Sequence, residues 1–267
     1  MIRSALRSVI RATGFRRTHV AAARMCCERY GLATFGTRRP REVGRILCYH
    51  SVGQPEWGVN DVTPELFRKQ IELALEAGFR FVPAGEIAKN GAGPRDLAIT
   101  FDDGLKSVLT NAAPILASYR VPWSLFVVSD WSDDKGRVRT DTVLDWREIE
   151  RTAALGAEIG SHSATHPDFG YLSKVQAADE LGRSRETIQQ RVGIRAETFA
   201  IPLGQSKNWT AVASEAAREV GYDLIYAQAE ETRPPGTVAR TFVTHFDGPH
   251  VFRSLLGGVF DRWEEWV

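Results

Sequence analysis

Short apolar runs alternate with longer amphipathic stretches from residue 45 onward. The apolar runs predict strands at 46–50, 79–82, 97–101, 124–128, 158–162, 198–201, 223–226 and 238–243. Helical periodicity separates them at 63–78, 105–118, 145–156, 172–192 and 209–220, with a short helix before residue 97 and a last one from about residue 250. Seven or eight strands alternating with helices predict parallel pairing, and we expect an α/β barrel rather than an open sheet.

The N-terminal segment differs from the rest of the chain in charge. Residues 1–45 hold eleven arginines against two glutamates, a net charge of +9, which leaves about −8 for the remainder. The pattern predicts a basic, weakly amphipathic helix without the apolar run of a secretory signal or a membrane span. We therefore treat residues 1–44 as a basic extension and residues 45–267 as one domain.

Three interpretations of this basic extension stay open. It could be a helix packed on the domain, a targeting sequence, or a helix on an anionic membrane surface, with residues 1–40 making the contact. No nucleic-acid-binding motif accompanies the charge. The remaining composition, 43% hydrophobic and 25% charged, is that of a soluble globular protein, and three cysteines give neither a disulfide framework nor a thiolate metal site.

Two adjacent carboxylates, Asp102 and Asp103, end the apolar run at 97–101 and precede Gly104. Successive side chains of a strand point to opposite faces, so both acids can share one target only where the strand gives way to a turn, which Gly104 permits. Neighbouring carboxylates repel each other, and a bound cation would remove that repulsion. The alternative is a helix N-cap followed by a solvated acid.

Two histidines four residues apart, His162 and His166, follow the predicted strand at 158–162. If the backbone turns there, both imidazoles can reach one ion, and Asp103 would complete a set of two histidines and one carboxylate. Such a set leaves coordination positions for water and substrate. Both motifs fall at C-terminal strand ends, where parallel α/β folds place their chemistry.

Three motifs, in this order and spacing, resemble those of the NodB-type polysaccharide deacetylases: Thr100-Phe101-Asp102-Asp103-Gly104, His162-Ser163-x-x-His166 and Phe199-Ala200-Ile201-Pro202-Leu203-Gly204. The similarity extends over residues 45–260 or so. It implies a distorted (β/α) barrel of seven or eight strands, and a divalent metal, usually zinc, that serves to hydrolyse N-acetyl or sometimes O-acetyl groups of glycans.

The resemblance also implies roles for individual residues. The metal ligands would be Asp103, His162 and His166. Asp102, beside the metal, would be the general base on the attacking water. The turn formed by Pro202, Leu203 and Gly204 would hold the oxyanion with the backbone N–H of Leu203.

The proton donor and the substrate contacts are less defined. His245 and His50 are the two candidates for the acid that protonates the leaving amine. Ala200 stands where the family often carries an arginine that orients the base, and Arg240 could supply that charge. Five tryptophans could stack on sugar rings, and Trp209 is the best placed among Trp57, Trp123, Trp131, Trp146 and Trp209.

The sequence therefore predicts a zinc-dependent hydrolase of carbon–nitrogen bonds other than peptide bonds. Its substrate would be an N-acetylated glycan or oligosaccharide, of the chitooligosaccharide or exopolysaccharide type. A carbohydrate-binding protein on the same fold and a metallohydrolase of another amide or ester are the alternatives. We expect a cytoplasmic enzyme, which could lie on the inner face of the membrane through its basic extension.

Overall fold

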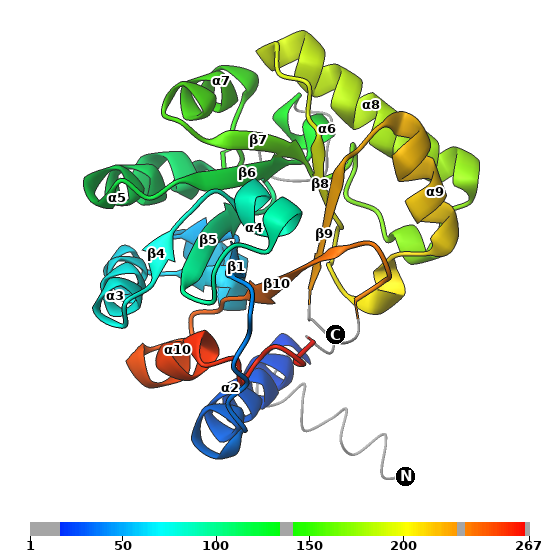
Figure 1. The fold of residues 1–267 in the computed structure, drawn as a ribbon. Helices are drawn as coiled ribbons and strands as arrows, with labels where there is room; N and C mark the ends of the chain where they lie inside the picture. The colour runs from blue at the N-terminus through cyan, green and yellow to red at the C-terminus, as the bar shows by residue number, and fades with distance from the viewer. Residues whose placement is uncertain (1–16, 134–140, 229–232, 265–267) are drawn as a thin grey trace, which may run out of the picture.

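The computed structural model describes residues 17–133, 141–228 and 233–264. Within these ranges, seven parallel strands form a closed ring: β1 (Arg45–Tyr49), β5 (Asp96–Phe101), β6 (Trp123–Val127), β7 (Glu158–Ser161), β8 (Thr198–Ala200), β9 (Leu224–Gln228) and β10 (Val238–Phe242). The ring closes because β1 pairs with β10 on one side and with β5 on the other. The expected barrel is thus confirmed (Figure 1).

One of the eight predicted strands, that at 79–82, does not enter the ring. β4 (Arg80–Phe81) pairs with the first two residues of β5, on the edge that β6 uses further along. A small parallel pair that the sequence pattern did not predict, β2 (Ser51–Val52) and β3 (Asp61–Val62), extends the chain beyond β1, with a 3₁₀ segment, η1 (Pro55–Asn60), between its strands. This excursion places residues 50–60 at the C-terminal end of the barrel.

Most helices surround the barrel on its outer side, but α4 (Ala84–Asn90) covers the N-terminal end of the barrel interior (Figure 1). The others are α3 (Pro64–Glu76), α5 (Ala113–Tyr119), the short α6 (Ser129–Ser132), α7 (Trp146–Ala154), α8 (Lys174–Val192), α9 (Ala211–Val220) and α10 (Pro249–Leu256). Further 3₁₀ turns occupy η3 (Phe169–Tyr171) and η4 (Ser206–Asn208). Two expected starts are confirmed by their caps, because Thr63 accepts from the N–H of Leu66 and Asp145 from that of Glu148.

The helix expected at 105–118 is shorter and differently wound. A π-helical segment, η2 (Val108–Ala112), precedes α5, and Pro114 lies in the first turn of α5. Because proline has no N–H, it cannot donate to the carbonyl of Thr110, four residues earlier. The wide turn therefore lies where the regular hydrogen-bond ladder is interrupted.

Alternate strand residues point into the barrel. Ile46, Ala98, Phe126, Ala200 and Tyr226 form a buried apolar cluster on this inner side, whereas residues one position away, such as Leu47 and Phe101, pack toward the helices in the main core. Asp102 continues the inward-facing set of Ala98 and Thr100. The interior of the barrel is thus filled below the site and polar at its C-terminal mouth.

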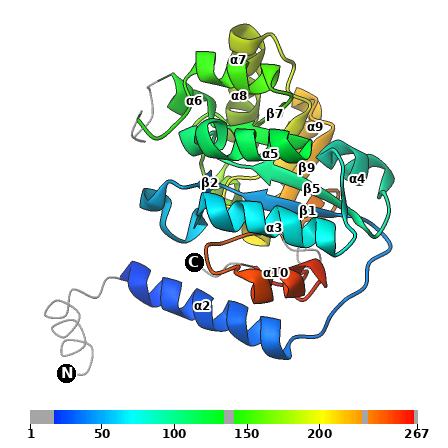
Figure 2. The ribbon, with the colours of Figure 1, turned by 90° about the vertical axis from the view of Figure 1, so that its left-hand side faces the viewer.

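The N-terminal helix α2 (Arg17–Phe35) lies beside α10 (Figures 1 and 2). Arg29 is fully buried there, bonded to both carboxylate oxygens of Asp247 and, over 3.2 Å, to the carbonyl of Phe242. Its guanidinium also lies 4.4 Å from the ring centroid of Phe260. Residues 17–35 therefore pack on the barrel domain, and the boundary at residue 44 stays a prediction.

No helix in the described ranges has both the length and the apolar character needed to cross a membrane. Met1 to Arg16, the first part of the basic extension, lies outside the described residues.

Candidate metal and catalytic site

The turn after β5 aims both carboxylates at one pocket. The N–H of Asp102 still bonds the carbonyl of Tyr49, 3.0 Å away, and extends the sheet by one residue. Asp103 then has φ of +71° and Gly104 of +67°, so the chain reverses at once. Among the described residues, six non-glycine residues have positive φ, and four of them lie at this site: Asp103, Ser163, His166 and Leu203. Backbone strain is thus concentrated where the chemistry is expected.

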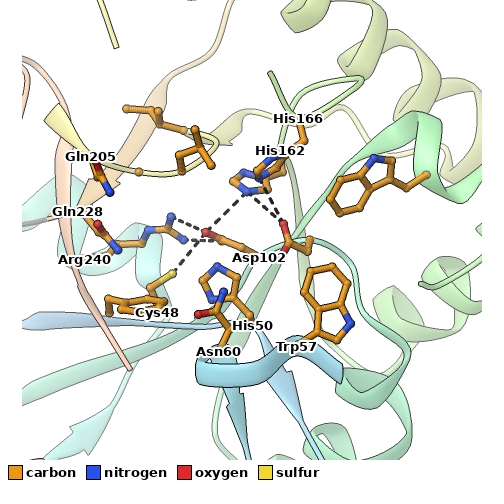
Figure 3. Close-up of a pocket in the computed structure, with 16 residues that line it drawn as sticks. Cys48, His50, Trp57, Asn60, Asp102, His162, His166, Gln205, Gln228 and Arg240 are labelled. Atoms are coloured by element: carbon orange, nitrogen blue, oxygen red, sulfur yellow. Dashed lines mark hydrogen bonds and ion pairs between the residues drawn. The ribbon is translucent and has the colours of Figure 1, made fainter. Parts of the chain in front are cut away.

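Asp102 is held by a buried arginine. Nη1 and Nη2 of Arg240 lie 2.6 and 2.7 Å from the two carboxylate oxygens of Asp102, and the Cys48 thiol lies 3.4 Å from Oδ2. Burial would raise the pKa of Asp102, but the charge of Arg240, with smaller effects of His162 and His50, holds this pKa well below its ordinary value. Asp102 is therefore ionised and fixed in orientation (Figure 3).

The loop 162–166 positions the two histidines. Nδ1 of His162 lies 2.8 Å from the carbonyl of Ala200, which can only accept, so Nδ1 carries the proton and Nε2 presents its lone pair. The carboxylate of Glu180 on α8 accepts from the N–H groups of Ala164 and Thr165, 3.1 and 2.9 Å away. These bonds fix the loop. As a result, Nε2 of His166 and Nε2 of His162 both face the carboxylate of Asp103.

Asp103 supplies the shared oxygen. Its Oδ1 lies 3.5 Å from His162 Nε2 and 3.6 Å from His166 Nε2, and this buried atom has no hydrogen-bond partner in the described part of the chain. Burial raises the pKa of Asp103 to about 6, with His50 opposing and Asp102 adding to the rise. Burial also lowers the pKa of His162 to about 3, so that imidazole is neutral.

This donor set fits a divalent metal. One carboxylate oxygen and two imidazole nitrogens, all within 4.8 Å of one another, are what zinc and related ions take. The buried Oδ1 of Asp103, which has no hydrogen-bond partner among the described residues, is available to bind a cation. A second group, Cys48, His50 and Asp102, meets the same distance criterion. It fits less well, because Arg240 already binds Asp102 and burial raises the pKa of the Cys48 thiol, which stays protonated.

A pocket of about 260 Å³ surrounds these residues. It brings together most of the predicted site: Asp102, Asp103, His162, His166, His50, Arg240, Leu203 and Gly204 all line it, and Pro202 precedes the Leu203 turn. Trp57 and Trp131 line it too, and the Trp131 ring lies 5.3 Å from that of His166. Leu203 has φ of +65°, and its N–H makes no hydrogen bond within the described residues.

Two predicted residues lie elsewhere. Trp209 is buried against Phe169 and Phe199, and its Nε1 donates to Ser214 over 2.7 Å, so it packs in the core rather than facing this pocket. His245 is exposed, with Nδ1 3.0 Å from the carbonyl of Gly58, and it does not line the pocket. His50, in contrast, lines the pocket and faces Asp102 (Figure 3).

Several pocket residues were not expected from the sequence. Gln228 lines the pocket because β9 runs two residues past its predicted end, and its buried Oε1 has no partner in the described ranges. Gln205 and Asn60 also line it. Continuing the apolar run at 223–226 to Gln228 would have identified one of them. Asn60 depends on the β2–β3 excursion, for which the sequence gives no periodic signal.

Residues 89–225 match the family model described as polysaccharide deacetylase. A chitooligosaccharide deacetylase of Sinorhizobium fredii is 32% identical over 84 residues, 31% of this chain and 34% of that protein. A chitooligosaccharide deacetylase of Bradyrhizobium is 28% identical over 105 residues, 38% of this chain and 43% of that protein. The chain thus spans less than half the length of these curated relatives.

Two solved structures share the fold. The deacetylase PplD of Streptococcus pyogenes, solved in complex with acetate, superposes with a TM-score of 0.68 at 20% identity, over 82% of this chain and 98% of that one. IcaB of Ammonifex degensii superposes with a TM-score of 0.68 at 24% identity, over 82% of this chain and 100% of that one. At these identities the likeness establishes the barrel and nothing finer.

Proposed function

Because the chain belongs to the polysaccharide deacetylase family, we propose that it is a metal-dependent hydrolase that removes N-acetyl groups from amino sugars of a glycan or oligosaccharide. One observation carries the proposal. Asp103, His162 and His166, which could hold a metal ion, lie in one pocket beside Asp102. Asp102 is an ionised carboxylate outside that group. A protein that only bound sugars would have no use for such a base.

Asp103, His162 and His166 would hold the cation, and we propose zinc because two neutral imidazoles and one carboxylate suit it. When bound, a divalent cation polarises the acetamide carbonyl and makes water more acidic. The hydrogen bond from His162 to the carbonyl of Ala200 prepares Nε2 as a ligand before any cation arrives.

Asp102 would accept the proton of the attacking water. Its low pKa keeps it ionised throughout the neutral range, and the two bonds from Arg240 fix the direction of its oxygens. A carboxylate held in this way needs no reorientation when water attacks the acetamide carbon.

His50 would give a proton to the leaving amine. It lines the pocket, its ring lies edge-on to Phe242 at 5.4 Å, and its buried Nδ1 has no hydrogen-bond partner in the described residues. Without a proton, the nitrogen would have to leave as a strongly basic anion, which is a poor leaving group, so it must be protonated as the C–N bond breaks. This placement favours His50 over the exposed His245.

The turn at Leu203 would stabilise the oxyanion. A positive φ at Leu203 leaves its N–H without a partner in the described residues, and the residue lines the pocket. A backbone N–H fixed in this way costs no reorganisation when negative charge develops on the carbonyl oxygen.

The pocket walls differ in chemistry and suit a sugar. Gln205 and Gln228 lie on the side of Arg240, and Trp57 lies on the other side of Asp102 (Figure 3). An aromatic face can stack on the apolar side of a pyranose ring, and amides can bond its hydroxyl groups. At about 260 Å³ the pocket is small, so we propose that one sugar residue enters it while the rest of the glycan stays outside.

The substrate class can be tested by profiling acyl release. The metal-loaded protein would be incubated with N-acetylglucosamine oligomers, with an O-acetylated xylan and with a simple aryl acetate, and acetate and free amine would both be measured. Acetate and amine formed in equal amounts from the oligomers, with slower release from the two esters, supports the proposal. Release from the esters alone would reject the amide substrate.

A further inference from the structure

A second cavity, of about 440 Å³, is lined by six arginines: Arg38, Arg39, Arg41, Arg45, Arg95 and Arg253. The other residues that line it are prolines, glycine or apolar residues, and none of the described residues in its wall is acidic. We call it the arginine cavity. A concave wall with one sign of charge concentrates an electrostatic field in a way that a scattered basic surface does not.

The arginine cavity lies at the opposite end of the barrel from the catalytic pocket. Arg45 is the first residue of β1, and Arg95 immediately precedes β5, whereas Asp102 immediately follows β5. A parallel strand of this length separates its two ends by roughly 20 Å. The cavity is therefore a separate feature and no part of the proposed catalytic site.

The segment that joins α2 to β1 brings three of the arginines to this cavity (Figure 2). It is fixed at Arg39, whose N–H bonds the carbonyl of Gly257 over 2.9 Å. The side chain of Arg38 also lies against Gly257, because a Cβ added to this glycine would lie 3.4 Å from Cγ and Cδ of Arg38. The segment thus follows the C-terminal end of α10 along a defined path.

Two more guanidinium groups are held in place by the domain. Nη1 of Arg95 donates to the carbonyl of Ala77 over 2.8 Å, and its Cζ lies 5.4 Å from the ring centroid of Phe79. Arg45 is buried, with Nη2 3.0 Å from Asp261 and 3.1 Å from the carbonyl of Arg39. These groups are oriented before any ligand binds, which reduces the entropy lost on binding.

The positive charge of the cavity is only partly balanced. Asp261 compensates Arg45, but the guanidinium groups of Arg38 and Arg253 make no hydrogen bond or ion pair within the described residues, and Arg95 bonds only a carbonyl. Like charges that face one cavity repel each other, and an anion between them would relieve the repulsion. Several planar, forked donors around one cavity match the tetrahedral oxygens of a phosphate group.

We propose that the arginine cavity binds a phosphate group, presented either by a free phosphorylated compound or by the headgroup of an anionic lipid. The contacts come from the guanidinium groups of Arg38, Arg95 and Arg253, which pair with no carboxylate of the described residues. The site is independent of the deacetylase chemistry, so a test of phosphate binding does not depend on the proposed function.

Two probes test the site on the full-length, metal-loaded chain. Inorganic phosphate would be titrated by calorimetry, and vesicles of phosphatidylcholine with and without phosphatidic acid would be tested by co-sedimentation. The test variant is the double substitution Arg38→Gln and Arg253→Gln. Its matched control is Arg147→Gln with Arg195→Gln, which removes the same charge from two exposed arginines outside the cavity. Metal content and unfolding temperature would be measured for each variant.

We expect saturable phosphate binding by the wild type and by the control, and binding at least about tenfold weaker in the test variant. Vesicle binding that needs phosphatidic acid and is lost only in the test variant identifies a lipid headgroup as the source. Phosphate binding without vesicle binding identifies a free compound. Absence of binding to both probes, or equal binding by the test variant and the control, would overturn the proposal.

Discussion

Arg240, on strand β10, donates two parallel hydrogen bonds of 2.6 and 2.7 Å to the carboxylate of Asp102, which follows the end of strand β5. The two residues are 138 positions apart in the sequence and both are buried. Burial of an isolated carboxylate would favour its neutral form, and the guanidinium reverses that preference. In this chain, Arg240 therefore decides whether the proposed base is charged.

Replacing Arg240 tests this coupling. We expect Arg240→Met to lower kcat/KM at least about 100-fold, because the base loses its orientation and part of its ionisation. Arg240 lowers the pKa of Asp102, so its removal raises that pKa, and the acidic limb of the pH profile of kcat/KM should move to higher pH. Arg240→Lys, which keeps the charge but not the forked geometry, should shift the limb less. An unchanged limb in both variants would show that Arg240 does not set the ionisation of the base.

Metal affinity should depend on pH through one proton. Asp103 must be ionised to bind a cation, and its pKa is raised to about 6, whereas burial lowers the pKa of both imidazoles, that of His162 to about 3 and that of His166 below its ordinary value. We expect affinity to be nearly constant above pH 6 and to fall about tenfold per pH unit below it. Calorimetry in buffers of different ionisation enthalpy would count the protons released. Release of two protons per ion at pH 5 would show that an imidazole also has to deprotonate.

The two candidate acids are separated by single substitutions. His50→Ala should lower kcat by about 100-fold or more, because His50 lines the pocket and would protonate the leaving amine. His245→Ala should retain near-wild-type kcat, because its ring faces Gly58 and Phe246 outside the pocket. Steady-state kinetics on N-acetylglucosamine oligomers measures both. A large loss for His245→Ala with little effect of His50→Ala would reverse the assignment.

The buried pair of Arg29 and Asp247 should dominate the stability contributed by α2. Arg29→Met leaves the Asp247 carboxylate buried without its partner, and we expect the free energy of unfolding to fall by about 3–5 kcal/mol. Arg24→Gln, on the same helix, removes a 58% exposed arginine paired with Glu28 and should change the free energy by less than about 1 kcal/mol. Urea denaturation compares the two. Equal, small effects would mean that α2 contributes little to the stability of the barrel.

The strands, and the grouping of Asp103 with His162 and His166 in space, could be predicted because their signals are local. An apolar run that stops at Asp102 and Asp103, and a second that stops at His162, define two C-terminal strand ends within a few residues. Parallel pairing then brings those ends together without further information. The helix starts at Thr63 and Asp145 were equally local, since a cap bonds only three residues ahead.

The unpredicted features depend on contacts between distant residues. Trp209 follows the third motif, yet its ring packs on Phe169 and Phe199, and no pattern in the sequence distinguishes a core tryptophan from one at a binding surface. The arginines of the N-terminal segment look alike in the sequence, but Arg29 meets a buried carboxylate 218 residues away, whereas Arg24 on the same helix pairs with the partly exposed Glu28. Burial, and not residue type, sets the role of each.

The most direct measurement is acetate release from N-acetylglucosamine oligomers by the metal-loaded protein, compared with a chelated sample and with Asp102→Asn. Asp102→Asn keeps the shape of the base and leaves Asp103, His162 and His166 in place, so metal content should remain stoichiometric. We expect release by the wild type and its loss in both comparison samples. Release by metal-loaded Asp102→Asn at the wild-type rate would show that Asp102 is not the base.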